Sequence, residues 1–424
     1  MKNEIIGQIT KSLQKLVRIP SKFSTPKKGA PRGKFIKKAL HTCVRIGKKI
    51  GFSEGGVIDG MVAWLDVGEG EEEFAVLCHV DVVPEGDGWS KKPYSGEILD
   101  GRIYGRGTAD DKGPMVCAMY AISSLIKEGK TPTKKIRFII GGDEEGFPKT
   151  DNPFALNDID SIDVYKKRRP LPKTGFSPDA EFPVIYAEKG ILHLELSIET
   201  NGDITNLNGG ERANVVPNFA SAEISGERVC AKGISAHGST PEKGKNAIIE
   251  LLNIASAKSD FAKKLYRLFA FTDGSGLGID CKDIESGALS MNVGIVRTVN
   301  EKFVFTLDIR YPVTRKKDEI IQQIKSVWQG ELKEIRHEKP LFVPKEDSLI
   351  KNLLESYQEV TGDKSEPIAI GGGTYARKLE KGVAFGALFP SQEDRMHMAD
   401  EYVSIENIEK TYLIYKKAIE KMCF

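Results

Sequence analysis

The sequence predicts a protein of the α/β class, in which a three-layer α/β domain is interrupted by a separate α+β domain. Three observations lead to this prediction. The 424 residues exceed the roughly 150 of a typical domain. The first third of the chain alternates strand-like with helix-like stretches. From about residue 190 the strands alternate polar and apolar residues, as half-exposed antiparallel strands do.

The first third of the chain supplies a strand, a helix and a second strand. Residues 74–79 form a nearly all-apolar run, as expected of a strand buried on both faces. Residues 115–127 carry apolar side chains at helical spacing, and Pro114 is tolerated in a helix's first turn. Residues 135–140 indicate the next strand, so the order is that of a βαβ unit. Residues 1–17 have a helical pattern and make a poor signal peptide.

The middle of the chain is expected to fold separately. Residues 191–198, 220–229 and 303–309 each alternate like an antiparallel strand, and residues 246–257 favour a helix. His193 is expected on the polar face of the first of these strands. From residue 348 the pattern returns to helices and to short apolar strands such as 384–389.

The composition argues against several classes of protein. Lys and Arg number 62 against 60 Asp and Glu, a formal charge of +2, so net charge draws the chain to neither nucleic acid nor a membrane surface. The sequence has no run of about 18 apolar residues, and no membrane span is expected. The 6 cysteines are scattered without a CxxC pair, which favours buried thiols of a reducing compartment. A globular cytoplasmic protein is therefore predicted.

Imidazole and acidic side chains gather where the predicted strands end. His79 stands at the end of the first buried strand and Asp81 comes two residues later, so the alternation of side chains along a strand lets both point to one side. Open α/β sheets bind ligands beyond the carboxyl ends of their strands. For this pair alone, a strand-end histidine capped by solvent is an equally good interpretation.

A glycine-rich loop at residues 105–113 precedes the predicted helix. Its glycine spacing matches neither the dinucleotide nor the P-loop motif, and a phosphate would meet the carboxylates of Asp110 and Asp111. These two acids favour either helix capping or ligation of a hard cation.

Three further acids and a late histidine complete the pattern. Asp143, Glu144 and Glu145 follow the second strand of the βαβ unit, and they repel one another unless solvent or a cation intervenes. Asp179 lies in a later turn, and His397 comes near the end of the chain. Each motif is weak by itself, but together they form the ligand set of a dinuclear zinc or manganese site.

Five ordered segments resemble those of the PepV-type dipeptidases, which belong to the aminoacylase and carboxypeptidase G superfamily of cocatalytic metallopeptidases. These segments are residues 79–81, 105–113, 144–145, 177–183 and 371–377. The resemblance runs essentially from end to end. It implies an α/β catalytic domain, residues 1–187 and 341–424, interrupted by an α+β lid domain at residues 188–340.

The resemblance implies two divalent metal ions per chain, zinc or alternatively manganese. It assigns His79 and Asp179 to one ion, Glu145 and His397 to the other, and Asp110 as the bridge. The chain runs 31 residues from His79 to Asp110, 35 to Glu145 and 34 to Asp179, each about one crossover unit. A bridging carboxylate can hold two metals about 3.5–4 Å apart, a spacing that lets both polarise one water.

The resemblance also implies the catalytic roles. Glu144 would be the general base, taking a proton from the metal-bound water and passing it to the leaving amine. The carboxylate of Asp81 would accept a hydrogen bond from the second ring nitrogen of His79. His237 of the lid would stabilise the oxyanion, with a water-exposed loop histidine as the alternative.

The resemblance also implies which residues bind the substrate. Those that match substrate-binding positions of the family are Asn214, Arg310, Gly372, Gly373 and Thr374. The guanidinium of Arg310 would bind a terminal carboxylate bidentately, which would make the enzyme an exopeptidase. The glycine loop would offer backbone donors to the same carboxylate, with a tight turn as the alternative.

The predicted function is that of a metal-dependent dipeptidase with a dipeptide substrate and with no nucleic-acid or membrane partner. An N-acyl-amino-acid deacylase with the same dinuclear site is the alternative, because the chemistry at the carbonyl is identical. A catalytically inactive peptide-binding module is a third hypothesis, and the intact ligand set speaks against it. The large lid favours a monomer, with a homodimer as the alternative.

Overall fold

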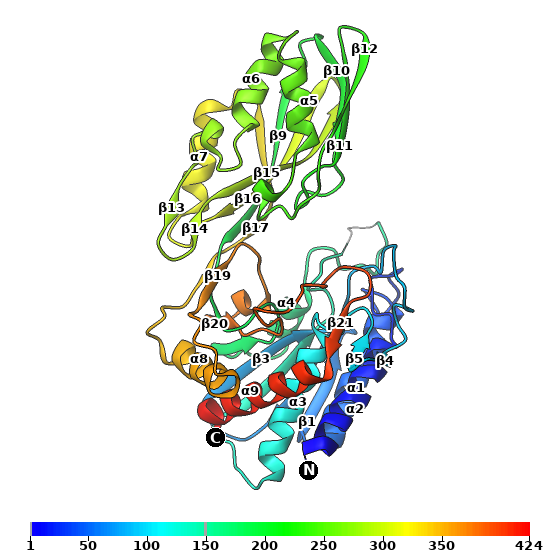
Figure 1. Ribbon diagram of the computed structural model, residues 1–424, viewed down its shortest axis with the longest axis vertical. Coiled ribbons are helices and arrows are strands. Elements are labelled where there is room, and N and C mark those ends of the chain that lie inside the picture. Colours follow the sequence, from blue (N-terminus) through cyan, green and yellow to red (C-terminus); the bar gives the residue numbers. More distant parts are fainter. Residues whose placement is uncertain (1, 148–150) are drawn as a thin grey trace. The chain divides into compact units, whose positions relative to one another are not determined.

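The computed structural model describes residues 2–147 and 151–424, and the chain forms two compact units (Figure 1). Unit 1 consists of Met1–Tyr186, Val343–Ile368 and Thr374–Phe424. Unit 2 consists of Ala187–Phe342 and the short segment Ala369–Gly373. The chain therefore leaves unit 1 and returns to it twice.

Unit 1 is built on a mixed sheet whose central strands run parallel. Along the sheet the order is β1-β2-β6-β3-β7-β20-β8, and β3 is parallel to both β6 and β7, as β7 is to β20. These strands are β1 (Glu54–Ile58), β2 (Val62–Val67), β3 (Glu73–His79), β6 (Lys135–Gly141), β7 (Thr174–Ser177), β8 (Ile185–Glu188) and β20 (Lys381–Ala384). A small separate sheet contains β4 (Glu97–Leu99), β5 (Arg102–Tyr104) and β21 (Tyr402–Ser404). The strands predicted at 74–79 and 135–140 are thus confirmed as β3 and β6.

Helices cover both faces of the unit 1 sheet, as the sequence predicts. Those of unit 1 are α1 (Lys2–Val17), α2 (Lys34–Ile50), α3 (Lys112–Lys127), α4 (Ser161–Lys166), α8 (Ser348–Thr361), α9 (Ile405–Cys423) and the 3₁₀ helix η3 (Tyr375–Lys378). Leu65 of β2 lies against α2 at Gly47, whereas Val62 of β2 packs in a buried cluster with Tyr165 of α4 and Tyr375 of η3. Because side chains alternate along a strand, α2 and α4 lie on opposite faces, which gives three layers.

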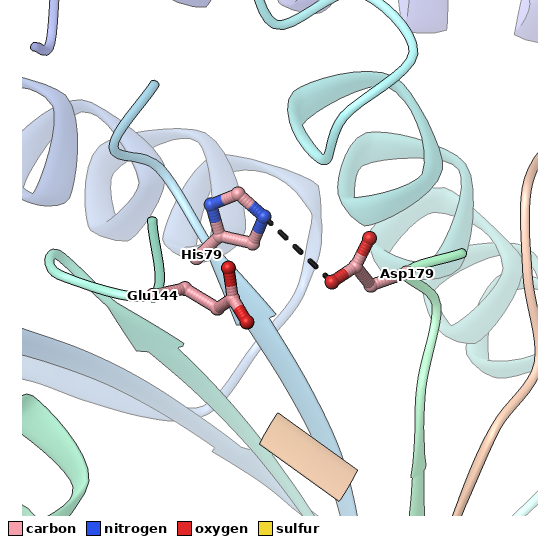
Figure 2. Close-up of side chains that lie close together, drawn as sticks. All are labelled: His79, Glu144 and Asp179. Carbon is pink, nitrogen blue, oxygen red and sulfur yellow. Dashed lines mark ion pairs between the residues drawn. The ribbon is translucent and has the colours of Figure 1, made fainter. Parts of the chain in front are cut away.

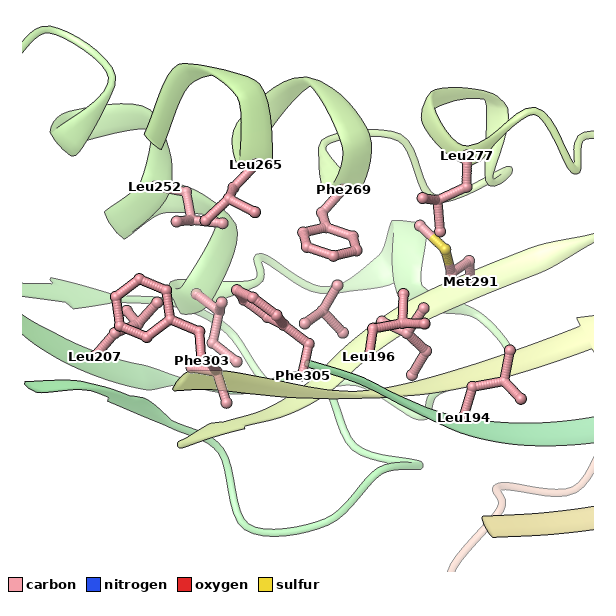
Figure 3. Packing of buried hydrophobic residues seen from close by; sticks show 14 of the residues in the cluster. Leu194, Leu196, Leu207, Leu252, Leu265, Phe269, Leu277, Met291, Phe303 and Phe305 are labelled. Carbon is pink, nitrogen blue, oxygen red and sulfur yellow. The ribbon is translucent and has the colours of Figure 1, made fainter. Parts of the chain in front are cut away.

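Unit 2 is an α+β unit with an antiparallel sheet of order β12-β11-β10-β15-β16-β9-β17. Its elements are β9 (Gly190–Glu199), β10 (Ile204–Gly209), β11 (Phe219–Ile224), β12 (Glu227–Lys232), η1 (Pro241–Lys243), α5 (Ala247–Ala255), α6 (Asp260–Phe269), η2 (Ser275–Leu277), β13 (Lys282–Asp283), β14 (Gly287–Ala288), β15 (Ser290–Val299), β16 (Lys302–Tyr311), α7 (Lys317–Val327) and β17 (Glu331–Glu338). Phe303 and Phe305 of β16 pack under Leu265 and Phe269 of α6 (Figure 3). Two short strands, β18 (Leu341–Phe342) and β19 (Ile368–Ile370), lie where the chain passes between units.

Two of the predicted strands are wrong in their extent. Residues 220–229 form parts of two strands, β11 and β12, which pair so that Ile224 lies opposite Glu227. The two residues between them, Ser225 and Gly226, have φ of 54° and 81°, as a tight hairpin turn requires. Residues 384–389 are a buried loop rather than a strand, since β20 ends at Ala384.

The six cysteines are free thiols, but they are not all buried. Cys43, Cys78, Cys117 and Cys423 are buried as predicted, whereas Cys230 is exposed. Within the described part of the chain, no helix combines the length and apolar character needed to cross a bilayer.

Candidate metal centre

The parallel strands bring the predicted site residues to one edge of the unit 1 sheet. His79 is the last residue of β3, and its register partner is Gly141 at the end of β6. Glu144 follows the end of β6, and Asp179 follows the end of β7. Because β3, β6 and β7 are parallel, their carboxyl ends meet at this edge.

One group of possible metal ligands consists of His79, Glu144 and Asp179, each of which offers one ligand atom within 4.8 Å of the others. Figure 2 shows the three side chains converging from the ends of three strands. His79 Nε2 lies 3.9 Å from Asp179 Oδ2, and their side chains are 1% and 13% exposed. The resemblance implies that Glu144 is a general base rather than a ligand, and the structure brings one of its carboxyl oxygens within 4.8 Å of the ligand atoms of the other two residues.

A second group consists of Asp110, Glu145 and His397, again with ligand atoms within 4.8 Å of one another. His397 Nε2 lies 2.8 Å from Asp110 Oδ2 and 3.1 Å from Glu145 Oε2. The other oxygen of Asp110, Oδ1, lies 2.9 Å from Nε2 of His79. Asp110 therefore contacts one histidine of each group, with a different oxygen for each.

Asp81 contacts His79 mainly through its backbone carbonyl rather than through its carboxylate, which the resemblance implied. The Nδ1 atom of His79 is nearest to the backbone carbonyl of Asp81, at 3.1 Å, and lies 3.5 Å from its carboxyl Oδ1. The other carboxyl oxygen, Oδ2, accepts a hydrogen bond from the Glu145 backbone N–H at 3.0 Å. Asp81 thus orients His79 mainly through its main chain, and its side chain fixes the turn that carries Glu145.

The acidic side chains at this edge disfavour one another's charge. Burial, followed by the nearby Asp110 carboxylate, raises the pKa of Asp179 to about 7. Burial also raises the pKa of Glu144 and of Glu145, and neighbouring carboxylates add to the rise. Burial alone would lower the pKa of His397, but the carboxylates of Glu145 and Asp110 raise it to about 11.

A divalent cation fits this donor set. Among the residues that the structure describes, no Lys or Arg side chain pairs with Asp110, Glu145 or Asp179. Carboxylate oxygens and imidazole nitrogens are common ligands of zinc, and manganese also accepts them. The two groups are therefore candidate metal-binding positions that share contact with Asp110.

Asp143 is a structural residue that the sequence did not single out from its acidic neighbours. Its Oδ2 accepts a hydrogen bond from Arg32 Nε at 2.9 Å, and both side chains are 0% exposed. Its Oδ1 accepts hydrogen bonds from Ser161 and from the Tyr375 hydroxyl, the latter at 3.0 Å. Arg32 also donates to the Ala155 carbonyl. Asp143 thus anchors the turn that carries Glu144 and Glu145, and only its place in a run of acids hinted at this.

In unit 2, the structure brings Asn214 and His237 together. Gly238, which follows His237, donates a backbone hydrogen bond to the carbonyl of Asn214 at 2.8 Å. His237 is exposed, and its Nδ1 lies 2.7 Å from the hydroxyl of Ser239. A side chain at position 238 would meet Asp308 Oδ2 at 2.5 Å, so glycine allows a close approach there.

Arg310 of unit 2 is held by a buried carboxylate. Its Nε and Nη2 donate to the two oxygens of Asp308, at 2.7 and 2.9 Å, and its Nη1 donates to the Gly371 carbonyl at 3.0 Å. His193 Nε2 lies 3.3 Å from Asp308 Oδ1, and His193 is 9% exposed. His193 is therefore a buried partner of Asp308 and not a residue of an open polar face. Arg310 reaches the glycine loop, whose next residues are the predicted Gly372 and Gly373.

Thr374 of unit 1 has a local structural contact. Its hydroxyl accepts a hydrogen bond from the Ala376 backbone N–H at 3.2 Å and so caps η3. The following residue, Tyr375, is the one that reaches Asp143.

Comparisons with known proteins agree on one family. Residues 75–421 match the model of Peptidase family M20/M25/M40. "Putative dipeptidase YtjP" of Bacillus subtilis (strain 168) is 35% identical, with 98% of this chain and 97% of the relative covered. A "Putative dipeptidase" of Staphylococcus epidermidis (strain ATCC 12228 / FDA PCI 1200) is 34% identical, with 93% and 92% covered.

Solved structures share the fold. An M20 family metallo-carboxypeptidase from Sulfolobus solfataricus has a TM-score of 0.63 at 16% identity, with 97% of this chain and 98% of that chain covered. Human carnosine dipeptidase 1 has a TM-score of 0.61 at 14% identity, with 99% and 97% covered. At these identities the likeness shows the fold alone.

The chain therefore belongs to peptidase family M20/M25/M40, and it is a hydrolase that acts on peptide bonds.

Proposed function

We propose that this M20-family hydrolase is a metal-dependent dipeptidase, which hydrolyses the single peptide bond of a dipeptide substrate. The observation that carries the proposal is the position of Asp110, whose two oxygens lie 2.9 Å from His79 Nε2 and 2.8 Å from His397 Nε2. A carboxylate shared in this way suits two neighbouring cations. The names of the relatives at 35% and 34% identity support dipeptides as the substrates.

Five side chains would hold the two ions. His79 and Asp179 would bind the first, Glu145 and His397 the second, and Asp110 both. Zinc is the proposed metal and manganese the alternative, since both accept mixed oxygen and nitrogen ligands. When bound, the two ions would polarise the peptide carbonyl and make a water molecule more acidic.

Glu144 would move the protons of the reaction. Its carboxyl oxygen lies within 4.8 Å of ligand atoms of His79 and Asp179, so it stands beside the first metal position. It would take a proton from the attacking water and deliver it to the nitrogen of the leaving amine. The same proximity would also suit a metal ligand. Measuring the bound metal of Glu144 variants together with their activity separates a general base from a ligand.

Residues of the glycine loop and of unit 2 would bind the substrate. Arg310 and the backbone of Gly372, Gly373 and Thr374 would bind its terminal carboxylate, and the contact of Arg310 with the Gly371 carbonyl supports this. Asp308 occupies the Nε–Nη2 edge of Arg310, so the carboxylate would meet the remaining edge. Asn214 would hold the substrate. His237, oriented by Ser239, would donate a hydrogen bond to the oxyanion.

Replacement of Glu144 tests the proposed mechanism. Glu144→Gln and Glu144→Ala are expected to lower kcat for a dipeptide by at least about 10²–10⁴, because a general base contributes about this much. The bound metal per chain, measured by elemental analysis, is expected to stay near that of the unchanged protein. Exposed Glu380 supplies a control variant, Glu380→Gln, that should keep full activity. Loss of metal together with activity would make Glu144 a ligand instead.

A substrate panel tests the assignment to dipeptides. Metal-stripped protein reconstituted with Zn²⁺ or Mn²⁺ is expected to hydrolyse dipeptides with a higher kcat/KM than N-acetyl amino acids. The reverse preference would indicate an N-acyl-amino-acid deacylase with the same site. Binding of dipeptides without any product would indicate an inactive peptide-binding module.

A further inference from the structure

A buried carboxylate that neither metal position uses lies next to the candidate metal centre, at Glu401. It follows His397 by 4 residues and directly precedes β21, and its side chain is 1% exposed. Burial of a carboxylate is costly unless an opposite charge and hydrogen bonds surround it. The groups that contact the Glu401 carboxylate therefore indicate its role.

The described hydrogen bonds to the Glu401 carboxyl group come from the loop between β5 and α3. Oε2 accepts from Arg106 Nη1 at 2.7 Å and from the Gly107 backbone N–H at 3.0 Å. Oε1 accepts from the backbone N–H of Ala109 at 2.9 Å and from that of Asp110 at 3.4 Å. The last of these donors belongs to the residue whose carboxylate contacts both histidines.

The backbone of Glu401 and the guanidinium of Arg106 also join Glu401 to the loop between β5 and α3. The backbone carbonyl of Glu401 accepts a hydrogen bond from the Gly105 N–H at 2.9 Å. Arg106 is itself held, because its Nη2 donates to the Glu85 carbonyl at 3.2 Å and its guanidinium lies 5.3 Å from the centre of the Trp89 ring. Burial raises the pKa of Glu401, and the charge of Arg106 opposes that rise.

We propose that Glu401 is a positioning residue of the metal centre, which sets the distance between Asp110 and His397. These two residues are 287 positions apart in the sequence, yet Asp110 Oδ2 and His397 Nε2 lie 2.8 Å apart. Glu401 belongs to the segment that carries His397, and its carboxylate holds the loop that ends in Asp110. It therefore tunes the affinity for the ion that these two residues would share. This inference rests on the metal centre proposed above.

Calorimetric titration of metal-stripped protein with Mn²⁺ tests the inference. Glu401→Gln keeps the size of the side chain but removes its charge, and it is expected to bind Mn²⁺ about 10–100-fold more weakly. Asp66→Asn is the matched control, because Asp66 is another buried carboxylate of unit 1, 2% exposed and 2.5 Å from Arg169 Nη2. This control is expected to bind Mn²⁺ as the unchanged protein does, even if it unfolds more easily.

Each outcome decides between the roles. Equal Mn²⁺ affinity in Glu401→Gln and the unchanged protein would overturn the inference, and so would equal weakening in Asp66→Asn. If Glu401→Gln does not fold by circular dichroism, Glu401→Asp replaces it, since the shorter side chain cannot keep all four hydrogen bonds; unchanged affinity would again refute the role. If the unchanged protein binds no Mn²⁺, the metal centre itself fails, and this inference with it.

Discussion

Units 1 and 2 each bury carboxylates beside a histidine, but they balance the charge differently. In unit 2, Asp308 forms two hydrogen bonds with Arg310, and His193 lies 3.3 Å from it. In unit 1, Asp110 and Glu145 meet His397, and no Lys or Arg of the described ranges 2–147 and 151–424 pairs with either carboxylate. Unit 2 therefore pairs its carboxylate with a guanidinium, whereas the carboxylates at the edge of unit 1 meet imidazoles, a donor set that suits a divalent cation.

Removal of divalent ions should give the largest difference between the two units. Exhaustive chelation is expected to abolish dipeptide hydrolysis, and Zn²⁺ or Mn²⁺ to restore it. Each ion at 100 times its Kd would stabilise unit 1 by about 2.7 kcal/mol. When the ions are added back, hydrogen exchange measured by mass spectrometry should slow in the loops after β3 and β6 and stay unchanged in β15 and β16. Full activity after complete chelation would contradict the comparison.

Neutralising one buried acid in each unit should have opposite effects on metal-free protein. Asp308→Asn leaves Arg310 buried without its counter-ion and is expected to lower the free energy of unfolding of unit 2 by about 3–5 kcal/mol. Glu145→Gln removes a like charge beside Asp110, so unit 1 should be at least as stable as before. Denaturant unfolding followed by hydrogen exchange would measure both. Similar losses in the two variants would refute the contrast.

The pH dependence of stability in unit 2 should show a smaller effect, which comes from the contacts of Asp308 with Arg310 and His193. Burial alone would raise the pKa of Asp308, but His193 and Arg310 outweigh it and lower that pKa. A pKa below the unfolded value of about 3.9 means that the stabilisation is complete above that pH and is lost as the pH falls through the folded-state value. Between pH 5 and pH 3 the unchanged protein should lose more stability in unit 2 than Asp308→Asn does. Identical pH profiles would argue against this role of the pair.

The edge of the unit 1 sheet could be predicted because its signals are local. Residues 74–79 and 135–140 are apolar runs, and each is followed within a few positions by an imidazole or a carboxylate. A strand, a helix and a strand in succession favour parallel pairing, which brings such strand ends together. The juxtaposition of His79 and Glu144 follows from this pattern alone.

The supporting contacts could not be predicted because their partners are distant in the sequence. Arg106 and Glu401 are separated by 295 positions, and Arg32 and Asp143 by 111. Nothing in the residues around Glu401 distinguishes it from an exposed acid before a strand. The hairpin of β11 and β12 is a different case, because Ser225 and Gly226 carried a local turn signal that the alternating pattern of residues 220–229 concealed.

The ion pair of Arg32 with Asp143 bears on how short an active form of this enzyme can be. The family match begins at residue 75, yet Arg32 lies well before it and neutralises the acid next to Glu144. A chain trimmed to residues 75–421 would lose α1, α2, β1 and β2 along with that guanidinium. Such a fragment would keep every proposed metal ligand, but the turn that presents two glutamates would rest on an uncompensated buried charge. Expression of a minimal catalytic unit should therefore retain the amino-terminal helices.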